Sequence, residues 1–251
     1  MLRYELRGPA AWLTIDRPDK LNAMTRAFFG ELRDALGRAD ADAGARCVVI
    51  EGAGRCFSVG GDIEGFGDLT GPADRRAYVR EAITGFRAVE ECTKPTIAAV
   101  HGHALGGGCE LTLVCDLVVA DTTARFGLPE TAVGLLPGPG VVRGRSNLTL
   151  HALKHMIFTG AVLEAEDAMR VGLVNEVVPE GGHRARAAGW ADAIAARSPL
   201  ALATAKALLS AEGWERLPHA VDAVAMLQGS EDVAEGIAAF VEKRAPVFPG
   251  R

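Results

Sequence analysis

The fold of this chain is decided by one stretch of its sequence, Lys94-Pro95-Thr96-Ile97-Ala98-Ala99-Val100-His101-Gly102-His103-Ala104-Leu105-Gly106-Gly107-Gly108-Cys109-Glu110-Leu111. The apolar run over residues 95–100 predicts a buried strand. The glycine triplet predicts a tight turn, and a helix is expected from Gly107 or Gly108 to Val114. A buried strand that runs through glycines into a helix is typical of α/β proteins.

The rest of the chain repeats this alternation of strands and helices. Further strands are expected at residues 10–15, 46–51, 117–120 and 174–178, and apolar stripes predict helices around 28–36 and 79–89. From Ser198 onward the sequence is alanine-rich and helical in pattern. We therefore expect an α/β core over residues 1–197 and a helical C-terminal extension over residues 198–251.

The composition excludes several classes of protein. The chain has 251 residues, of which 49% are hydrophobic and 24% charged, as in soluble globular proteins and not in disordered ones. A net charge of −5 provides no global positive field, so neither a nucleic acid nor an anionic membrane is the expected partner. No run approaches the roughly 18 apolar residues of a membrane span, and the N-terminus lacks the apolar region of a secretory signal.

The cysteines and histidines predict neither disulfides nor a metal site. The five cysteines include no Cys-x-x-Cys pair, which indicates reduced core thiols and a cytoplasmic location. His151 and His155 have metal-ligand spacing on an expected helix, but no third ligand lies near them in the sequence.

Three glycine-rich loops follow strands, and the Gly106–Gly108 triplet is the most specific of them. Unobstructed amides at the start of a helix suit either a phosphate or a developing oxyanion. Phosphate is the weaker choice, because Cys109-Glu110 stand where the Walker motif needs Lys-Ser/Thr, and Gly-x-Gly-x-x-Gly is absent. Gly-x-Ser-x-Gly is absent too, which disfavours a serine hydrolase of the nucleophile-elbow type.

Two glutamates are candidates for acid–base chemistry. Glu110 is expected in the first helical turn after the glycine triplet, and Glu130 follows twenty residues later in a third loop. Taken alone, Glu130 is a solvated loop carboxylate. The intervening strand and loop are long enough to bring it back beside Glu110, where the two carboxylates can act as a pair.

Taken together, these motifs resemble the enoyl-CoA hydratase/isomerase, or crotonase, family over nearly the whole chain. The matching segments are residues 94–111, Ile15-Asp16-Arg17-Pro18-Asp19-Lys20-Leu21-Asn22-Ala23, Phe57-Ser58-Val59-Gly60-Gly61-Asp62-Ile63, residues 124–130, Phe158-Thr159-Gly160 and residues 240–248. The resemblance implies an α/β, crotonase-like ββα spiral core with a helical C-terminal extension that forms a homotrimer or a dimer of trimers.

The resemblance also implies a site. The backbone N–H groups of Gly61 and Gly107 would form an oxyanion hole for an acyl-CoA thioester, with Glu110 and Glu130 as catalytic groups. Coenzyme A would be a part of the substrate, so no separate cofactor is expected. The residues implied to contact the CoA or the rest of the substrate are Lys20, Leu21, Ser58, Gly60, Asp62, Ile63 and Lys243. For Lys243 and its neighbour Arg244, a contact with the CoA phosphates and a solvated position on the surface are equally good interpretations.

Two glutamates favour an enoyl-CoA hydratase, which adds water across the C2=C3 double bond, because isomerases of this family usually have one acid–base carboxylate. The alternatives are Δ3,Δ2-enoyl-CoA isomerisation or other acyl-CoA enolate chemistry, and a non-catalytic protein, such as an RNA-binding one, which the negative charge argues against. Residues 139–146 depart from the Gly-Gly-Thr-Gln-Arg-type run of many relatives, which leaves the placement of Glu130 open. Residues 64–85 are expected to line the acyl pocket.

Overall fold

The structure is a computed structural model that describes residues 1–63, 65, 69–210 and 217–246. Parts of two predicted regions lie outside the described residues: 64 and 66–68 of the expected acyl pocket, and 211–216 and 247–251 of the C-terminal extension.

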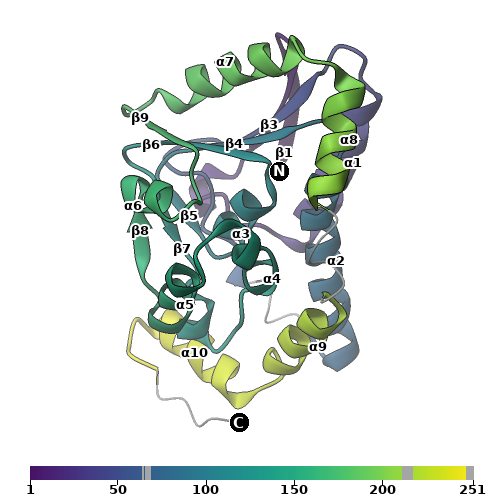
Figure 1. Ribbon diagram of the computed structural model, residues 1–251. Helices are drawn as coiled ribbons and strands as arrows, with labels where there is room; N and C mark the ends of the chain where they lie inside the picture. The colour runs from purple at the N-terminus through teal and green to yellow at the C-terminus, as the bar shows by residue number, and fades with distance from the viewer. Residues whose placement is uncertain (64, 66–68, 211–216, 247–251) are drawn as a thin grey trace.

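A six-stranded sheet forms the centre of the protein (Figure 1). Its order is β1(Leu2–Arg7), β2(Ala10–Ile15), β3(Cys47–Gly52), β4(Thr96–Val100), β6(Leu117–Asp121) and β9(Glu176–Val178). β1 and β2 pair antiparallel, and all the other neighbours are parallel. β2, β3 and β4 are buried along their whole length, which explains their nearly continuous apolar sequences.

The two faces of this sheet pack against different helices. On β3, Cys47 and Val49 face one cluster with α7(His183–Ala195), while Val48 and Ile50 face a larger one with α1(Arg26–Ala41) and α2(Pro72–Glu91). This alternation follows from the two-residue repeat of a strand. The predicted stripes are confirmed, since α1 buries Phe28, Phe29, Leu32 and Leu36, and α2 buries Val79, Ile83, Phe86 and Val89.

The glycine-rich stretch forms a second, smaller sheet that the sequence pattern did not reveal. β5(His103–Leu105) lies between Gly102 and Gly106, which both have positive φ angles, and pairs with β7(Arg125–Gly127). β8(Val162–Glu164) completes the sheet on the other side of β7. The expected helix is confirmed as α3(Gly107–Val114).

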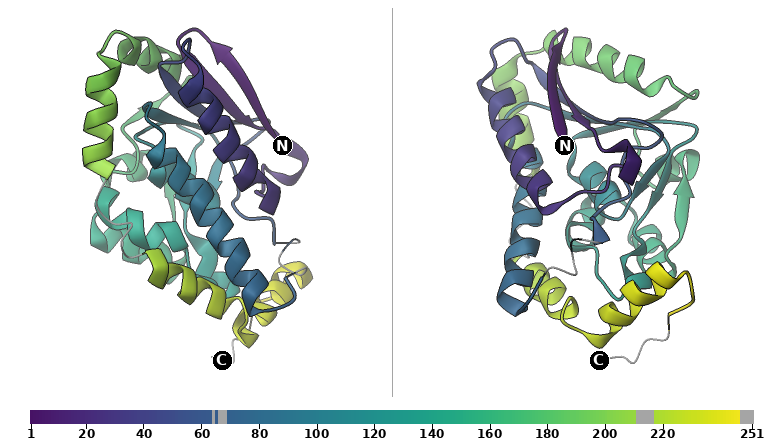
Figure 2. Two further views of the ribbon diagram at one scale, coloured as in Figure 1. Left: turned by 90° about the vertical axis from the view of Figure 1, so that its right-hand side faces the viewer. Right: turned by 180° about the vertical axis from the view of Figure 1, so that it is seen from behind.

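The remaining helices lie at the end of the molecule opposite α7 or along its side (Figures 1 and 2). They are the short η1(Pro18–Lys20) and η3(Pro129–Val133), and α4(Gly138–Asn147), α5(Leu150–Thr159), α6(Ala165–Arg170), α8(Pro199–Ser210), α9(Leu217–Leu227) and α10(Glu231–Glu242). α9 packs against α2 and α4. α10 meets η3 so closely that a Cβ at Gly236 would lie 2.6 Å from Val133 Cα. Within the described ranges, no helix is both long and apolar enough to cross a membrane.

Candidate active site

Two glycine-rich segments contact each other backbone to backbone beside the main sheet. A Cβ at Gly60, whose φ is +92°, would lie 2.7 Å from Gly107 N. A Cβ at Gly108 would lie only 2.2 Å from Ser58 O. No other residue type fits at these positions without displacing backbone atoms, so the glycines are required for the contact between the segments.

This contact presents the N–H groups of Gly61 and Gly107 to one cavity. Gly107 is the first residue of α3, so its N–H points out of the helix N-terminus. The position of a Cβ on Gly107 would be 3.5 Å from Gly61 N, which places the two amides side by side. Neither N–H has a protein acceptor among the described residues.

The cavity has a volume of about 720 Å³ and is formed by segments from most of the chain. Lys20, Leu21, Asp62 and Ile63 line it together with the two amides and the two glutamates. The helices and the segments that follow them contribute mainly apolar side chains, namely Phe29, Tyr78, Val79, Ala82, Ile83, Phe86, Leu135, Leu136, Val224, Gln228 and Phe240.

Glu110 lies in the first turn of α3 and is almost completely buried. Its Oε1 accepts a hydrogen bond of 3.0 Å from Gly140 N in the first turn of α4. Burial raises the pKa of Glu110 to about 7, although the bond from Gly140 opposes the shift. The atypical 139–146 segment thus supplies an amide to Glu110, the first of the two carboxylates.

Glu130 is the second residue of η3 and lines the same cavity. Its Oε2 is buried with no hydrogen-bond partner, and its Oε1 would lie 3.2 Å from a Cβ on Gly106. Burial and the nearby charge of Glu110 raise the pKa of Glu130 well above its ordinary value. The alternative of a solvated loop carboxylate is therefore wrong, and the fold brings both glutamates to one site.

Three of the predicted substrate contacts do not line the cavity. Ser58 has no exposed surface, and its hydroxyl donates to Asn22 O and accepts from Gly60 N. The predicted contact of Ser58 with a ligand is therefore wrong, and its side chain has an internal role. Gly60 precedes Gly61 outside the cavity lining, and its positive φ and missing Cβ allow the loop to pack against Gly107. Lys243 is an exposed residue that ends α10. Arg244 forms ion pairs with Glu235 and Glu242.

Sequence reasoning missed the helical wall of the cavity. Tyr78 and Ile83 on α2 fall within the expected acyl-pocket segment, but Val224, Gln228 and Phe240 come from the C-terminal region, which was expected to form subunit contacts. The apolar stripes of these helices were visible in the sequence. Which cavity they face depends on how the helices fold back on the core.

The fold and the site define a class of α/β protein in which paired backbone amides and paired buried carboxylates share one cavity. The comparisons with known proteins identify the family to which this class belongs. The family model for enoyl-CoA hydratase/isomerase matches residues 7–251, and the chain belongs to this family. A probable enoyl-CoA hydratase of Rhizobium meliloti is 37% identical over 258 residues, covering 100% of this chain and 98% of the relative. The 2,3-dehydroadipyl-CoA hydratase of Escherichia coli is 36% identical, covering 95% and 94%. The crystal structure of carnitinyl-CoA hydratase from Mycobacterium avium superposes with a TM-score of 0.88 at 38% identity, covering 100% and 98%.

Proposed function

We propose that this protein is an enoyl-CoA hydratase that adds water across the C2=C3 double bond of a 2-enoyl-CoA thioester. The observation that supports this most strongly is that two buried glutamates with raised pKa values share one cavity with two unpaired backbone amides. Relatives named as enoyl-CoA hydratases at similar identity over most of the chain support the same activity.

The amides provide the electrostatic part of the reaction. As a nucleophile adds to C3, negative charge develops on the thioester oxygen, and the N–H groups of Gly61 and Gly107 bind that oxygen. Each such donor contributes roughly 3–4 kcal/mol where charge develops. The start of α3 adds the favourable end of its helix dipole.

The glutamates divide the proton transfers between them. Glu110 removes a proton from a water molecule while its oxygen bonds to C3, and Glu130 donates its proton to C2 as the enolate collapses. The cause of the Glu130 shift supports this assignment, because burial and the charge of an ionised Glu110 raise the pKa of Glu130 well above its ordinary value and favour its protonated form. The cycle leaves Glu110 protonated and Glu130 ionised, and exchange with solvent restores both.

Coenzyme A is a part of the substrate, so the reaction needs no separate cofactor. The CoA portion would enter past Lys20, Leu21, Asp62 and Ile63, and the acyl chain would extend between the helices. The protein is expected in the cytoplasm, with roles in fatty-acid metabolism and β-oxidation.

The test is the loss of enoyl-thioester absorbance when purified protein is mixed with crotonyl-CoA or longer 2-enoyl-CoA thioesters. Turnover to the 3-hydroxyacyl product supports the proposal, and complete inactivity on all chain lengths contradicts it. The same amides and a single glutamate also allow an allylic proton to move, so product analysis with 3-enoyl-CoA distinguishes an isomerase.

We also propose that the protein assembles as a homotrimer or a dimer of trimers. Several large apolar side chains on α5 and α8 lie at the surface, including Phe158 at 74%, Leu200 at 77% and Leu209 at 83% exposure. Exposed apolar groups of this size are typical of interaction surfaces. Light scattering of the purified protein gives the mass in solution, and a monomer would contradict the proposal.

A further inference from the structure

The segment Arg17–Met24 holds the loop that carries Gly61, although only Asp19, Lys20, Leu21 and Ala23 of this segment line the cavity. We propose that Asn22 and Ser58 are positioning residues, which through a chain of hydrogen bonds fix the direction of the Gly61 N–H. The proposal rests on the oxyanion role assigned to that N–H above.

Asn22 is fixed in an uncommon conformation by its own side chain. It is completely buried and has a φ of +58°, directly after Leu21 with a φ of +52°. Its Oδ1 accepts from Arg17 N at 3.0 Å, and its Nδ2 donates to Ala53 O and Cys56 O, both at 2.8 Å. Asparagine tolerates the left-handed region better than most residues, and these bonds use one acceptor and both donors of its amide.

Residues 21–24, held in this way, bind the neighbouring loop at consecutive positions. Val59 N donates to Leu21 O at 3.2 Å, and Ser58 Oγ donates to Asn22 O at 2.8 Å. Met24 N then donates to Gly60 O at 2.7 Å, and Asp62 N donates to Met24 O at 2.9 Å. An ion pair between Arg17 and Asp62 adds a side-chain link between the same two segments.

These bonds fix the orientation of the peptide group that contains the Gly61 N–H. The Gly60 carbonyl and the Gly61 N–H belong to one planar trans peptide, so they point in opposite directions. Met24 N fixes the direction of that carbonyl, and Ser58 Oγ accepts the preceding N–H, that of Gly60, at 3.1 Å. Between these two hydrogen bonds, only the φ and ψ angles of Gly60 can rotate. The bonds therefore hold the Gly61 N–H in one direction, toward the cavity.

Ser58 also connects the loop to the second amide. Its backbone N donates to His103 O at 2.9 Å, and its backbone O accepts from Leu105 N at 3.0 Å. β5 leads directly into Gly107, so one residue ties the loop of Gly61 to the strand before the other donor. Displacing Ser58 would therefore change the distance between the two amides.

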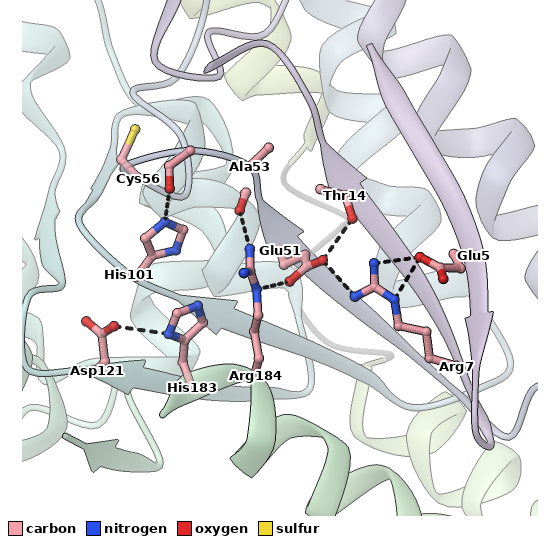
Figure 3. A network of polar contacts seen from close by, with 12 residues as sticks. Glu5, Arg7, Thr14, Glu51, Ala53, Cys56, His101, Asp121, His183 and Arg184 are labelled. Atoms are coloured by element: carbon pink, nitrogen blue, oxygen red, sulfur yellow. Dashed lines mark hydrogen bonds and ion pairs between the residues drawn. The ribbon is translucent and has the colours of Figure 1, made fainter. Parts of the chain in front are cut away.

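The start of the Gly61 loop is anchored by a second polar network, in addition to the bonds from Asn22 to Ala53 O and Cys56 O (Figure 3). His101 Nε2 lies 2.9 Å from Gly54 O, and its ring stacks on His183, whose Nδ1 lies 3.0 Å from Asp121. Arg184 donates to Gly52 O and to Glu51. Because this network does not include Ser58, substitution of Ser58 should misdirect residues 58–61 and leave the start of the loop in place.

The test is Ser58→Ala, with Thr96→Val as its matched control. Both hydroxyls are completely buried, and each accepts from a backbone N–H and donates to an oxygen, since Thr96 Oγ1 bonds Asp116 N at 3.0 Å and Asp116 Oδ2 at 2.8 Å. We expect Ser58→Ala to lower kcat roughly tenfold with KM nearly unchanged, because a misdirected donor is weakened and not removed. Thr96→Val should lose similar thermal stability and keep kcat.

The second readout is the carbonyl stretching frequency of a bound, isotopically labelled enoyl-CoA thioester. An oxyanion hole polarises the carbonyl and lowers this frequency on binding, and the shift should be smaller in Ser58→Ala than in wild type or Thr96→Val. A full shift and unchanged kcat in folded Ser58→Ala would overturn the positioning role. Should that variant not fold, Asn22→Gly serves instead, because it keeps the left-handed backbone and Ser58, and we expect the same smaller shift.

The two proposals fail in different ways. A wild-type protein that lowers the carbonyl frequency but hydrates no enoyl-CoA contradicts the hydratase assignment, while the positioning role is still tested by the smaller shift in Ser58→Ala. A wild-type protein that hydrates enoyl-CoA, with Ser58→Ala equal to Thr96→Val in kcat and frequency, contradicts only the positioning role.

Discussion

The two walls of the cavity are built in opposite ways. The glycine wall, made of residues 59–62 and 106–110, consists of backbone packed on backbone, with hydrogen bonds to Asn22 and Ser58 behind it. The helical wall, made of α2, α9 and α10, presents apolar side chains, and one of them, Phe240, is 62% exposed. The first wall leaves no room for a Cβ at Gly60 or Gly108, whereas we expect the second to accept other side chains. We therefore expect the glycine wall to carry out the chemistry and the helical wall to determine which acyl group is bound.

The largest expected effect comes from removing either carboxylate on the glycine side of the cavity. Glu110→Gln and Glu130→Gln should each lower kcat by at least ~10²-fold, because each removes one proton transfer. Steady-state hydration of crotonyl-CoA measures this, with Glu176→Gln, an exposed partner of Arg186 on β9, as the control. Full activity in either glutamine variant would contradict the two-carboxylate mechanism.

The rigidity of the glycine wall is tested by Gly108→Ala. The added Cβ would lie 2.2 Å from Ser58 O, a backbone atom that cannot move alone. We expect a loss of roughly 2–3 kcal/mol in the free energy of unfolding and a large drop in kcat. Gly37→Ala in α1 is the matched control, because nothing lies within 4 Å of its Cβ, and it should stabilise the protein by about 0.5–1 kcal/mol. Equal stability of the two variants would show that the segments are not tightly packed.

The electrostatic strain of the site should appear in the pH dependence of stability. The pKa of Glu110 is raised from 4.5 to about 7, so between these values the folded protein binds more protons than the unfolded chain and loses stability as the pH rises. Glu110→Gln removes this loss and should be more stable than wild type by roughly 1–3 kcal/mol at pH 8, with little difference near pH 4. Chemical denaturation across this pH range measures the difference, and parallel curves for the two proteins would contradict the buried-acid assignment.

The smallest expected effect, on the helical wall, concerns substrate choice. Ala82 on α2 lines the cavity, and Ala82→Leu should lower kcat/KM for long acyl chains about tenfold relative to crotonyl-CoA, with little change in the four-carbon rate. Ala73→Leu, exposed in the first turn of the same helix, is the control. An equal loss for all chain lengths would mean that α2 takes part in the chemistry.

Much of the glycine wall could be predicted because its signals are local. A strand, a glycine triplet and a helix with Glu110 in its first turn are contiguous in the sequence, and their order fixes which amides point out of the helix. Glu130 was a candidate partner of Glu110 from the residues themselves, the resemblance to the family added Gly61, and the structure brings both to the same cavity.

The errors fall where a side chain's direction depends on distant segments. Ser58 lies within the predicted loop, but its hydroxyl points to Asn22, 36 residues earlier, and not to the cavity. The small sheet of β5, β7 and β8 was missed because three-residue strands carry too little pattern.

The sequence by itself determined the α/β alternation, the family and the residue types of the site, because glycines, glutamates and apolar periods act through local geometry. Only the tertiary structure decided that the carboxyl group of Glu130 is buried near Glu110, that α9 and α10 close the same chain's cavity, and that Asn22 and Ser58 lie behind the Gly61 amide. Burial and the pKa shifts that follow from it are properties of packed segments, so they exist only once distant parts of the chain meet.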